Sequence, residues 1–151
     1  MKFYDLLVEK AKEDGIVKNV VGGIVMDNKK NVLILTRKAD DFMGGIDELP
    51  SGGVKEGESL YDALVREVKE ETNLDISNPK VITALDDIAP DRHFVTIWLI
   101  CDEFSWELKC MEPSKEDEWK RFDLNNLPKN LYSPTKHLIN HYKNLKIKNY
   151  D

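Results

Sequence analysis

The chain has 151 residues, of which 33% are charged and 41% hydrophobic, and its formal net charge is −6 at pH 7. This length and composition predict one globular domain over residues 1–151, with enough chain to bury a core. The negative charge excludes broad nonspecific binding to nucleic acid, which needs a basic surface, and no apolar run is long enough to span a membrane. Cys101 and Cys110 lack metal-site spacing, and the charged N-terminus is not typical of a signal peptide, so we expect reduced thiols in a cytoplasmic protein.

The order of the predicted elements indicates the class of fold. In chain order, the sequence predicts a helix at 1–15, strands at 17–27 and 31–38 that form a hairpin near Asn28, a glycine-rich loop at 39–58, a helix at 60–72, strands at 80–87, 93–104 and 118–124, and a helix at 133–145. The strands are β-branched runs, and Ser59 with Asp62 three residues later is typical of a helix start. Strands mixed with at least two long helices predict an α/β fold in which helices cover a mixed sheet.

The helix predicted at 60–72 carries glutamates among its apolar side chains. At about 100° per residue, with Leu60 at zero, the apolar side chains fall between about 300° and about 80°. Glu67, at about 340°, and Glu71, at about 20°, fall inside this sector, and Glu70, at about 280°, lies just beside it. A solvated acidic face would instead lie at about 180°. These carboxylates therefore need a positive partner, because partly buried carboxylates are costly unless they are paired or bound to metal.

A bound cation is the partner that fits best. Arg66, at about 240°, is poorly aimed to neutralise three carboxylates, whereas Mg²⁺ and Mn²⁺ prefer oxygen ligands. The preceding turn contains Gly52, Gly53 and Gly57, which permit close backbone approach and positive φ angles. A backbone carbonyl of Ser51 or Gly52 could therefore complete the coordination shell of the cation.

The segment 52–74 resembles the Nudix box, which is a glycine, five residues, a glutamate, seven residues and then Arg-Glu-aliphatic-x-Glu-Glu-x-Gly-aliphatic. Eight of its nine defined positions match: Gly52, Glu58, Arg66, Glu67, Val68, Glu70, Glu71 and Leu74. The ninth is Asn73 in place of glycine, and asparagine also tolerates the left-handed conformation expected after a helix. The resemblance covers about residues 17–141, so the predicted helix at 1–15 lies outside it.

The resemblance implies a fold and an activity. The fold would be the Nudix α/β/α sandwich, with a mixed β-sheet between helices. The activity would be Mg²⁺-dependent hydrolysis of a pyrophosphate bond in a nucleoside diphosphate derivative, with Mn²⁺ as a substitute. A (deoxy)nucleoside triphosphate, giving the monophosphate and pyrophosphate, is the leading substrate.

Several alternatives to this activity remain open. They are ADP-ribose or dinucleoside polyphosphate hydrolysis, and a Nudix-fold module that binds nucleotides without hydrolysing them. An acidic calcium-binding domain is a weaker alternative, because EF-hand spacing is absent. The partner would be a small nucleotide, with no nucleic acid and no membrane, and the chain would be a monomer or a homodimer.

Within the motif, the resemblance implies roles for individual residues. Glu70 and Glu71 would be metal ligands, and Glu67 would be either a ligand or the base that deprotonates the attacking water. Arg66 would orient Glu67 or pair with Glu58. For Glu58 itself, a metal ligand and a structural partner of Arg66 are both open.

Outside the motif, the resemblance implies Glu112 and Asn130 as candidates, the predicted topology adds Arg37 and Lys38, and each has a structural alternative. Glu112, with Glu118 as second choice, could supply a further acidic ligand, or could be a solvated loop carboxylate. Arg37 and Lys38 could bind phosphate, or could form an exposed basic pair. Asn130 could read the nucleobase through its amide, or could cap a turn.

Other residues are more typical of packing than of catalysis. We expect His93 to be a hydrogen-bonded structural histidine, although a place near the substrate stays open. We expect Trp98, Trp106 and Trp119 to pack in the core or against the sheet.

Overall fold

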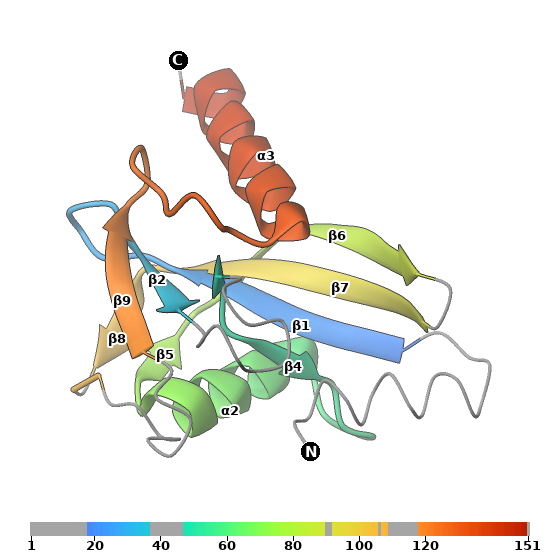
Figure 1. Cartoon of the computed structure of the whole chain (residues 1–151). Helices are drawn as coiled ribbons and strands as arrows, with labels where there is room; N and C mark the ends of the chain where they lie inside the picture. Colours follow the sequence, from blue (N-terminus) through green and yellow to red (C-terminus); the bar gives the residue numbers. More distant parts are fainter. Residues whose placement is uncertain (1–17, 37–46, 90–91, 106, 109–117, 151) are drawn as a thin grey trace.

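The computed structural model describes residues 18–36, 47–89, 92–105, 107–108 and 118–150 (Figure 1). Its elements, in chain order, are β1 (Lys18–Val25), β2 (Asn31–Thr36), β3 (Asp47–Glu48), β4 (Ser51–Gly53), α2 (Leu60–Thr72), β5 (Asp75–Ser77), β6 (Lys80–Ala89), β7 (Arg92–Cys101), β8 (Glu103–Ser105), β9 (Glu118–Asp123) and α3 (Ser133–Tyr150). The helix predicted at 1–15 lies outside the described residues. No helix in the described ranges is long and apolar enough to cross a membrane.

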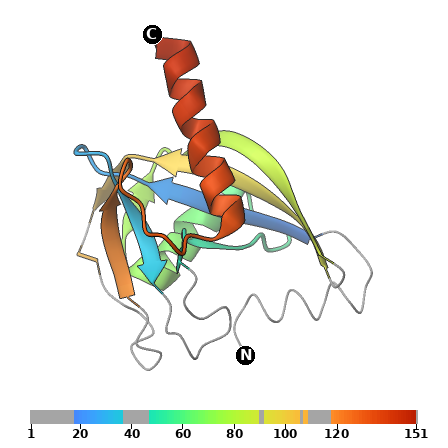
Figure 2. The same cartoon turned by 45° about the horizontal axis from the view of Figure 1, so that its top comes forward.

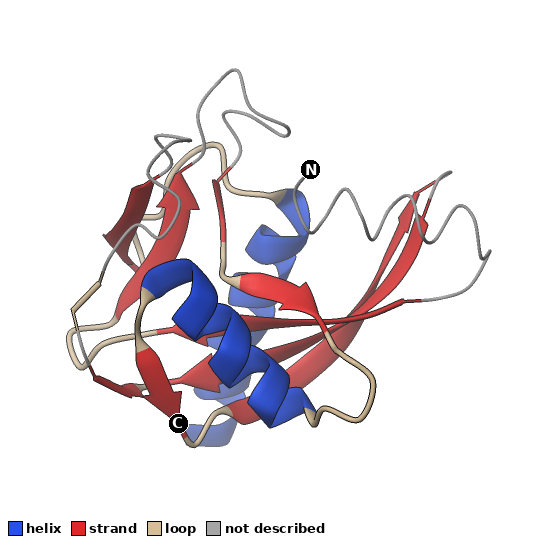
Figure 3. Ribbon diagram, turned by 90° about the horizontal axis from the view of Figure 1, so that it is seen from below, coloured by secondary structure: helices blue, strands red, loops and turns tan. Residues whose placement is uncertain are grey.

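The predicted mixed sheet is confirmed. Its strand order is β4-β1-β7-β6, with β1 parallel to β7 and the other two pairs antiparallel. A second, antiparallel sheet has the order β3-β2-β9, and β5 pairs with β8. The two described helices lie on opposite faces of the larger sheet (Figures 1 and 3). The α/β/α layering is therefore confirmed.

Successive side chains of the central strands point to opposite faces of the sheet, so apolar residues form a core on each face. Between the sheet and α2 lie the buried residues Val21, Val25, Leu33, Ala63, Leu64, Val68, Leu74, Ile76, Leu99 and Cys101. Toward α3 lie Ile24, Met26, Val32, Ile34, Leu49, Trp98, Leu124, Leu131, Leu138, Ile139 and Tyr142. The C-terminal half of α3 extends away from the sheet (Figure 2). Both faces of β1 are buried, which explains why its sequence is almost continuously apolar.

Two glycines of β1 let large side chains pack on it from either side. A Cβ at Gly22 would overlap the ring of Trp98, on the α3 side. A Cβ at Gly23 would lie 3.1 Å from Leu64 of α2, on the other side. Small residues at these positions therefore allow Trp98 and α2 to approach the sheet closely.

The predicted hairpin near Asn28 is wrong in its pairing. The turn is present, because the Asp27 carboxylate accepts the backbone N–H groups of Lys29 and Asn31 at 2.9 Å each. A single bridge, Met26 to Val32, then joins the two strands before they diverge. β1 pairs with β4 and β7, whereas β2 pairs with β3 and β9 in the other sheet. The local sequence encodes the turn, but long-range pairing decides which strands become neighbours.

The predicted loop at 39–58 is also partly wrong. Residues 47–48 and 51–53 form the short strands β3 and β4, and β4 pairs with β1 through Gly52 opposite Val21. Strands of this length leave no periodic pattern in the sequence. Their pairing matters because it fixes the glycine turn directly before α2.

The tryptophans and cysteines that the structure describes are packing residues. Trp98 is buried and Trp119 is half-buried, whereas Trp106 lies outside the described residues. Cys101 is a buried free thiol that donates to the carbonyl of Glu103 at 3.0 Å. Burial raises the pKa of this thiol, so it is a poor nucleophile at neutral pH. Cys110 also lies outside the described residues.

Candidate active site

The helix α2 has the bounds that the sequence predicts, Leu60–Thr72, and both of its ends are capped. The Ser59 hydroxyl accepts the backbone N–H of Asp62 at 3.1 Å, which satisfies one of the unpaired donors of the first turn. Asn73 follows the last turn with φ 68°, and its N–H donates to the carbonyl of Lys69. The left-handed conformation predicted at Asn73 is confirmed.

Glu67 is buried, as its position around the helix predicts, with 5% of its surface exposed. Its carboxylate lies against the backbone of β4 so closely that a Cβ at Gly52 would overlap it. Gly52 is therefore required for close approach of the backbone to the carboxylate. Burial raises the pKa of Glu67, which makes its carboxylate a stronger proton acceptor, and Arg66 opposes this shift.

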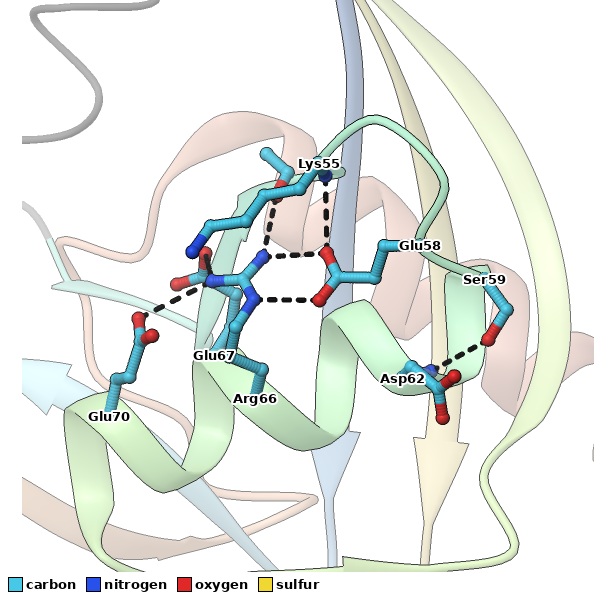
Figure 4. Close-up of polar contacts among 8 residues, drawn as sticks. Lys55, Glu58, Ser59, Asp62, Arg66, Glu67 and Glu70 are labelled. Atoms are coloured by element: carbon cyan, nitrogen blue, oxygen red, sulfur yellow. Dashed lines mark hydrogen bonds and ion pairs between the residues drawn. The ribbon is translucent and has the colours of Figure 1, made fainter.

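Arg66 is the centre of the polar contacts, and the expectation that it is poorly aimed is wrong (Figure 4). Its Nε and Nη2 donate to the two carboxylate oxygens of Glu58 at 2.8 Å and 2.9 Å. Its Nη1 donates to Oε1 of Glu67 at 2.7 Å and to Oε2 of Glu70 at 3.4 Å. Its Nη2 also donates to the carbonyl of Gly53 at 3.0 Å. The long side chain carries the guanidinium well away from the angle of its own Cβ, which the helical projection could not show.

The pairing with Arg66 holds Glu58 ionised. Hydrogen bonds from Arg66 lower the pKa of Glu58 to about 2, and the backbone N–H of Lys55 donates to the same carboxylate at 3.1 Å. The same bonds with Glu58 raise the pKa of Arg66. Of the two roles open for Glu58, the geometry therefore favours the structural partner of Arg66.

Glu70 and Glu71 lie in the turn that follows Glu67. The Glu70 side chain is exposed, with 54% of its surface accessible, and Glu71 is half-buried. Within the part of the chain that the structure describes, no group of three or more His, Cys, Asp or Glu side chains is arranged to hold a metal ion. The guanidinium of Arg66 instead bonds to Glu58, Glu67 and Glu70.

The residues near Glu67 nevertheless provide donors suited to a hard cation. They are carboxylate oxygens on consecutive turns of α2, next to the backbone of β4, and divalent ions such as Mg²⁺ prefer oxygen donors. Ser51 and Gly52, the predicted carbonyl donors, both lie on β4. The donor chemistry fits a divalent cation, although the described side chains are arranged around Arg66.

The predicted residues outside the motif are only partly brought to this site. Arg37, Lys38 and Glu112 lie outside the described residues. Glu118 is exposed at the start of β9 and pairs with Lys120 at 3.3 Å. In the loop before α3, the carbonyl of Asn130 accepts the N–H of Asp47 at 3.0 Å, and its side chain is exposed.

His93 has the hydrogen-bonded environment expected of a structural histidine. Its Nε2 lies 2.8 Å from Oδ1 of Asp86 on the neighbouring strand β6. This pair joins the two strands of the β6–β7 hairpin, and within the described residues no hydrogen bond or ion pair of these two side chains reaches α2.

Three polar contacts connect segments that are distant in the sequence, and sequence reasoning missed all of them. The carboxyl of Asp47 is buried and accepts a hydrogen bond from Thr36, and burial raises its pKa. Tyr132 donates from its hydroxyl to Asp87 at 3.0 Å. The third is the bond from the Asn73 side chain to the backbone of Glu107 at 3.1 Å. Only Asn73 gave a signal in the sequence, as a departure from glycine, and its partner lies 34 residues away.

Comparison with known proteins identifies the family. The model of the NUDIX domain matches residues 17–142, which is most of the chain. The chain belongs to the NUDIX family of hydrolases. The matched region contains the acidic helix, the glycine turn before it and both sheets.

Individual NUDIX relatives carry different names. The chain is 44% identical over 115 residues to an ADP-ribose pyrophosphatase of Methanocaldococcus jannaschii, a match that covers 73% of this chain and 63% of the relative. It is 33% identical over 93 residues to an 8-oxo-dGTP diphosphatase of Proteus vulgaris, covering 60% of this chain and 80% of the relative. A MutT NUDIX hydrolase from Burkholderia pseudomallei has the same fold, with a TM-score of 0.75 and 25% identity over 83% of this chain and 98% of that one.

The Glu58–Arg66 pair makes stability depend on pH in a predictable direction. The folded pKa of Glu58, about 2, lies below the unfolded value of about 4.3, so the stabilisation is complete above about pH 4.3 and is lost as the pH falls toward about 2. We expect the wild type to exceed Glu58→Gln in free energy of unfolding at pH 7, and this difference to shrink between pH 4.3 and pH 2. Urea unfolding at a series of pH values measures it. A difference that stays constant down to pH 2 would contradict the pairing.

Proposed function

We propose that this chain hydrolyses a pyrophosphate bond in a nucleoside diphosphate derivative, with Mg²⁺ as cofactor and Mn²⁺ as a substitute. The observation that carries the proposal is the buried carboxylate of Glu67, held between Gly52 and the guanidinium of Arg66, one turn from Glu71. A carboxylate whose pKa is raised by burial and that has a specific charged partner is typical of a functional site. NUDIX hydrolases generally use divalent metal ions, which agrees with the oxygen donors of α2.

The names of the relatives bear on the substrate. One is named for ADP-ribose and another for 8-oxo-dGTP, and both molecules contain a nucleoside diphosphate. The sequence alone favours a nucleoside triphosphate. The 44% identity to the ADP-ribose pyrophosphatase supports ADP-ribose more strongly, so we place it first and a (deoxy)nucleoside triphosphate second.

The residues of the proposed site, of which Arg37, Lys38 and Glu112 lie outside the described ranges, would have the following roles. Glu70 and Glu71 would hold the cation, with backbone carbonyls of Ser51 or Gly52, and Glu67 would be a further ligand or would accept the proton of the attacking water. Bound divalent cations would neutralise the pyrophosphate and acidify water. Arg66 would hold Oε1 of Glu67 in place, and its bidentate pairing with Glu58 would fix its own position. Arg37 and Lys38 would contact phosphate, and Glu112 would add a carboxylate.

Product analysis with a substrate panel tests the proposal directly. We expect hydrolysis of ADP-ribose to AMP and ribose 5-phosphate, or of a nucleoside triphosphate to the monophosphate and pyrophosphate, depending on the substrate. Activity should vanish after exhaustive chelation and return on addition of Mg²⁺. Dinucleoside polyphosphates belong in the same panel. Binding of these nucleotides without turnover would select the non-catalytic alternative, and activity that survives chelation would remove the role assigned to the glutamates.

Substitution of the proposed ligands should separate catalysis from folding. Glu70→Gln and Glu71→Gln each replace an anionic donor with a neutral amide of nearly the same shape. Turnover should fall at least as much as the about 10- to 100-fold that loss of a ligand's supporting residue costs. Asp62→Asn is the matched control, an exposed carboxylate on the same helix, and should retain activity. Equal activity in all three variants would show that Glu70 and Glu71 hold no catalytic cation.

Base recognition is proposed for the side chain of Asn130. Its carbonyl already bonds to Asp47 of β3, so Asn130→Ala removes the amide and keeps the backbone contact. We expect kcat/KM for the preferred nucleotide to fall by roughly tenfold, as for loss of one hydrogen bond to a substrate, and poorer substrates to change less. Asn126→Ala, an exposed asparagine of the same loop, is the control. A uniform loss on all nucleotides would show that Asn130 supports the loop and does not read the base.

A further inference from the structure

Asn73 joins the last turn of α2 to a distant part of the chain. Its Nδ2 donates to the carbonyl of Glu107 at 3.1 Å, across 34 residues of sequence. Glutamate 107 follows strand β8, whose partner β5 begins two residues after Asn73. The Nudix box has glycine at this position, and glycine has no side chain with which to make the bond. The contact is therefore a property of this chain's own departure from the motif.

The cap itself does not explain the choice of asparagine. At φ 68° glycine is at least as favourable as asparagine, and the capping bond comes from the backbone N–H to Lys69. Asparagine adds only its amide, and that amide is used in the long-range bond to Glu107.

Further contacts join the end of α2 to the start of β5 and join residues 107–108 to the core. Lys69 Nζ donates to the carbonyl of Asn73 and to Oδ2 of Asp75, both at 3.2 Å. Next to Glu107, Leu108 packs on the core cluster between the sheet and α2. Among the described residues, the hydrogen bond from Asn73 thus joins the backbone at 107–108 to the end of α2, and the side chain of Leu108 joins it to the core.

We propose that Asn73 is a positioning residue that fixes the last turn of α2, with Glu70 and Glu71, relative to Glu107 and the β5–β8 pair. The inference rests on the proposed function, in which these two glutamates hold the cation. They lie two and three residues before Asn73, so a change in the end of the helix moves their carboxylates. Loss of the amide should weaken cation binding more than it weakens the fold.

The test compares Asn73→Gly with a matched control, Asn78→Gly. Asn78 is also left-handed, with φ 52°, and its Nδ2 donates to Oε2 of Glu103 at 2.9 Å. Both variants keep a conformation that glycine favours and lose one side-chain hydrogen bond near β8, but only Asn73 lies at the end of α2. The measurements are amide hydrogen exchange in the last turn of α2, at Glu70, Glu71 and Thr72, Mn²⁺ titration without substrate, and the Mg²⁺ dependence of ADP-ribose and 8-oxo-dGTP hydrolysis.

We expect Asn73→Gly to speed exchange at these amides and to weaken Mn²⁺ binding by about threefold to tenfold, the range for one lost hydrogen bond. The Mg²⁺ concentration for half-maximal turnover should rise by a similar factor, and KM at saturating Mg²⁺ should stay unchanged. Asn78→Gly should lower Tm by about as much as Asn73→Gly does, but it should leave Mn²⁺ affinity unchanged.

The outcomes separate this inference from the proposed function. Mn²⁺ affinity that is unchanged in Asn73→Gly, or reduced equally in both variants, overturns the inference while the proposed function stands. A wild type that binds Mn²⁺ but hydrolyses nothing in the panel overturns the proposed function, and the Mn²⁺ and exchange measurements still decide the role of Asn73. A wild type that binds no Mn²⁺ overturns both.

Discussion

The carboxylate of Glu67, buried against the backbone of Gly52, is the constraint on which the rest of the site depends. A carboxylate loses hydration when it is buried, so it must be bonded to a positive group to remain ionised. In this chain Arg66 provides that group, and the geometry of Arg66 is fixed in turn by its two bonds to Glu58. Removal of any one of these residues therefore changes the electrostatics of the others.

The fold holds β4 and α2 close together at this site. β4 is the edge of the larger sheet and pairs with β1, and the first and middle turns of α2 pack on the same sheet through Ala63, Leu64 and Val68. Gly23 of β1 lets Leu64 approach the strand, and Gly52 of β4 lets Glu67 approach the edge. The same structural device, a glycine beneath a helical side chain, thus serves packing at one position and the acidic site at the other.

The sequence predicts the features that are local and periodic. The bounds of α2, its caps and the burial of Glu67 follow from residue spacing, because a helix repeats at a fixed angle and its caps require particular side chains. The mixed sheet between helices follows from the order of elements and from the resemblance to the Nudix box. The two-residue strand β3 and the separation of β1 from β2 do not, because they depend on pairing with residues far along the chain.

In the candidate site too, the sequence predicts local features but not contacts that depend on long side chains or on distant residues. Helical angles place Cβ atoms correctly but cannot place the end of a long side chain, so they did not predict that Arg66 reaches three carboxylates. The resemblance to the Nudix box, by contrast, implied Glu67 and Glu58 as its partners, and the structure has both contacts. The partner of Asn73 could not be predicted either, since nothing near Glu107 in the sequence marks its carbonyl as an acceptor. The proposed phosphate contacts at Arg37 and Lys38 and the proposed further metal ligand Glu112 lie outside the described residues and stay predictions.

The central claim is that the carboxylates of α2 take up a divalent cation, although the described side chains are gathered around Arg66. Anomalous scattering from crystals soaked in Mn²⁺ tests it most directly, because the signal locates the ion without reference to activity. The account predicts a peak within coordination distance, about 2.0–2.5 Å, of carboxylate oxygens among Glu67, Glu70 and Glu71. A Mn²⁺ ion bound elsewhere on the chain, with these glutamates still paired as they are here, would contradict it.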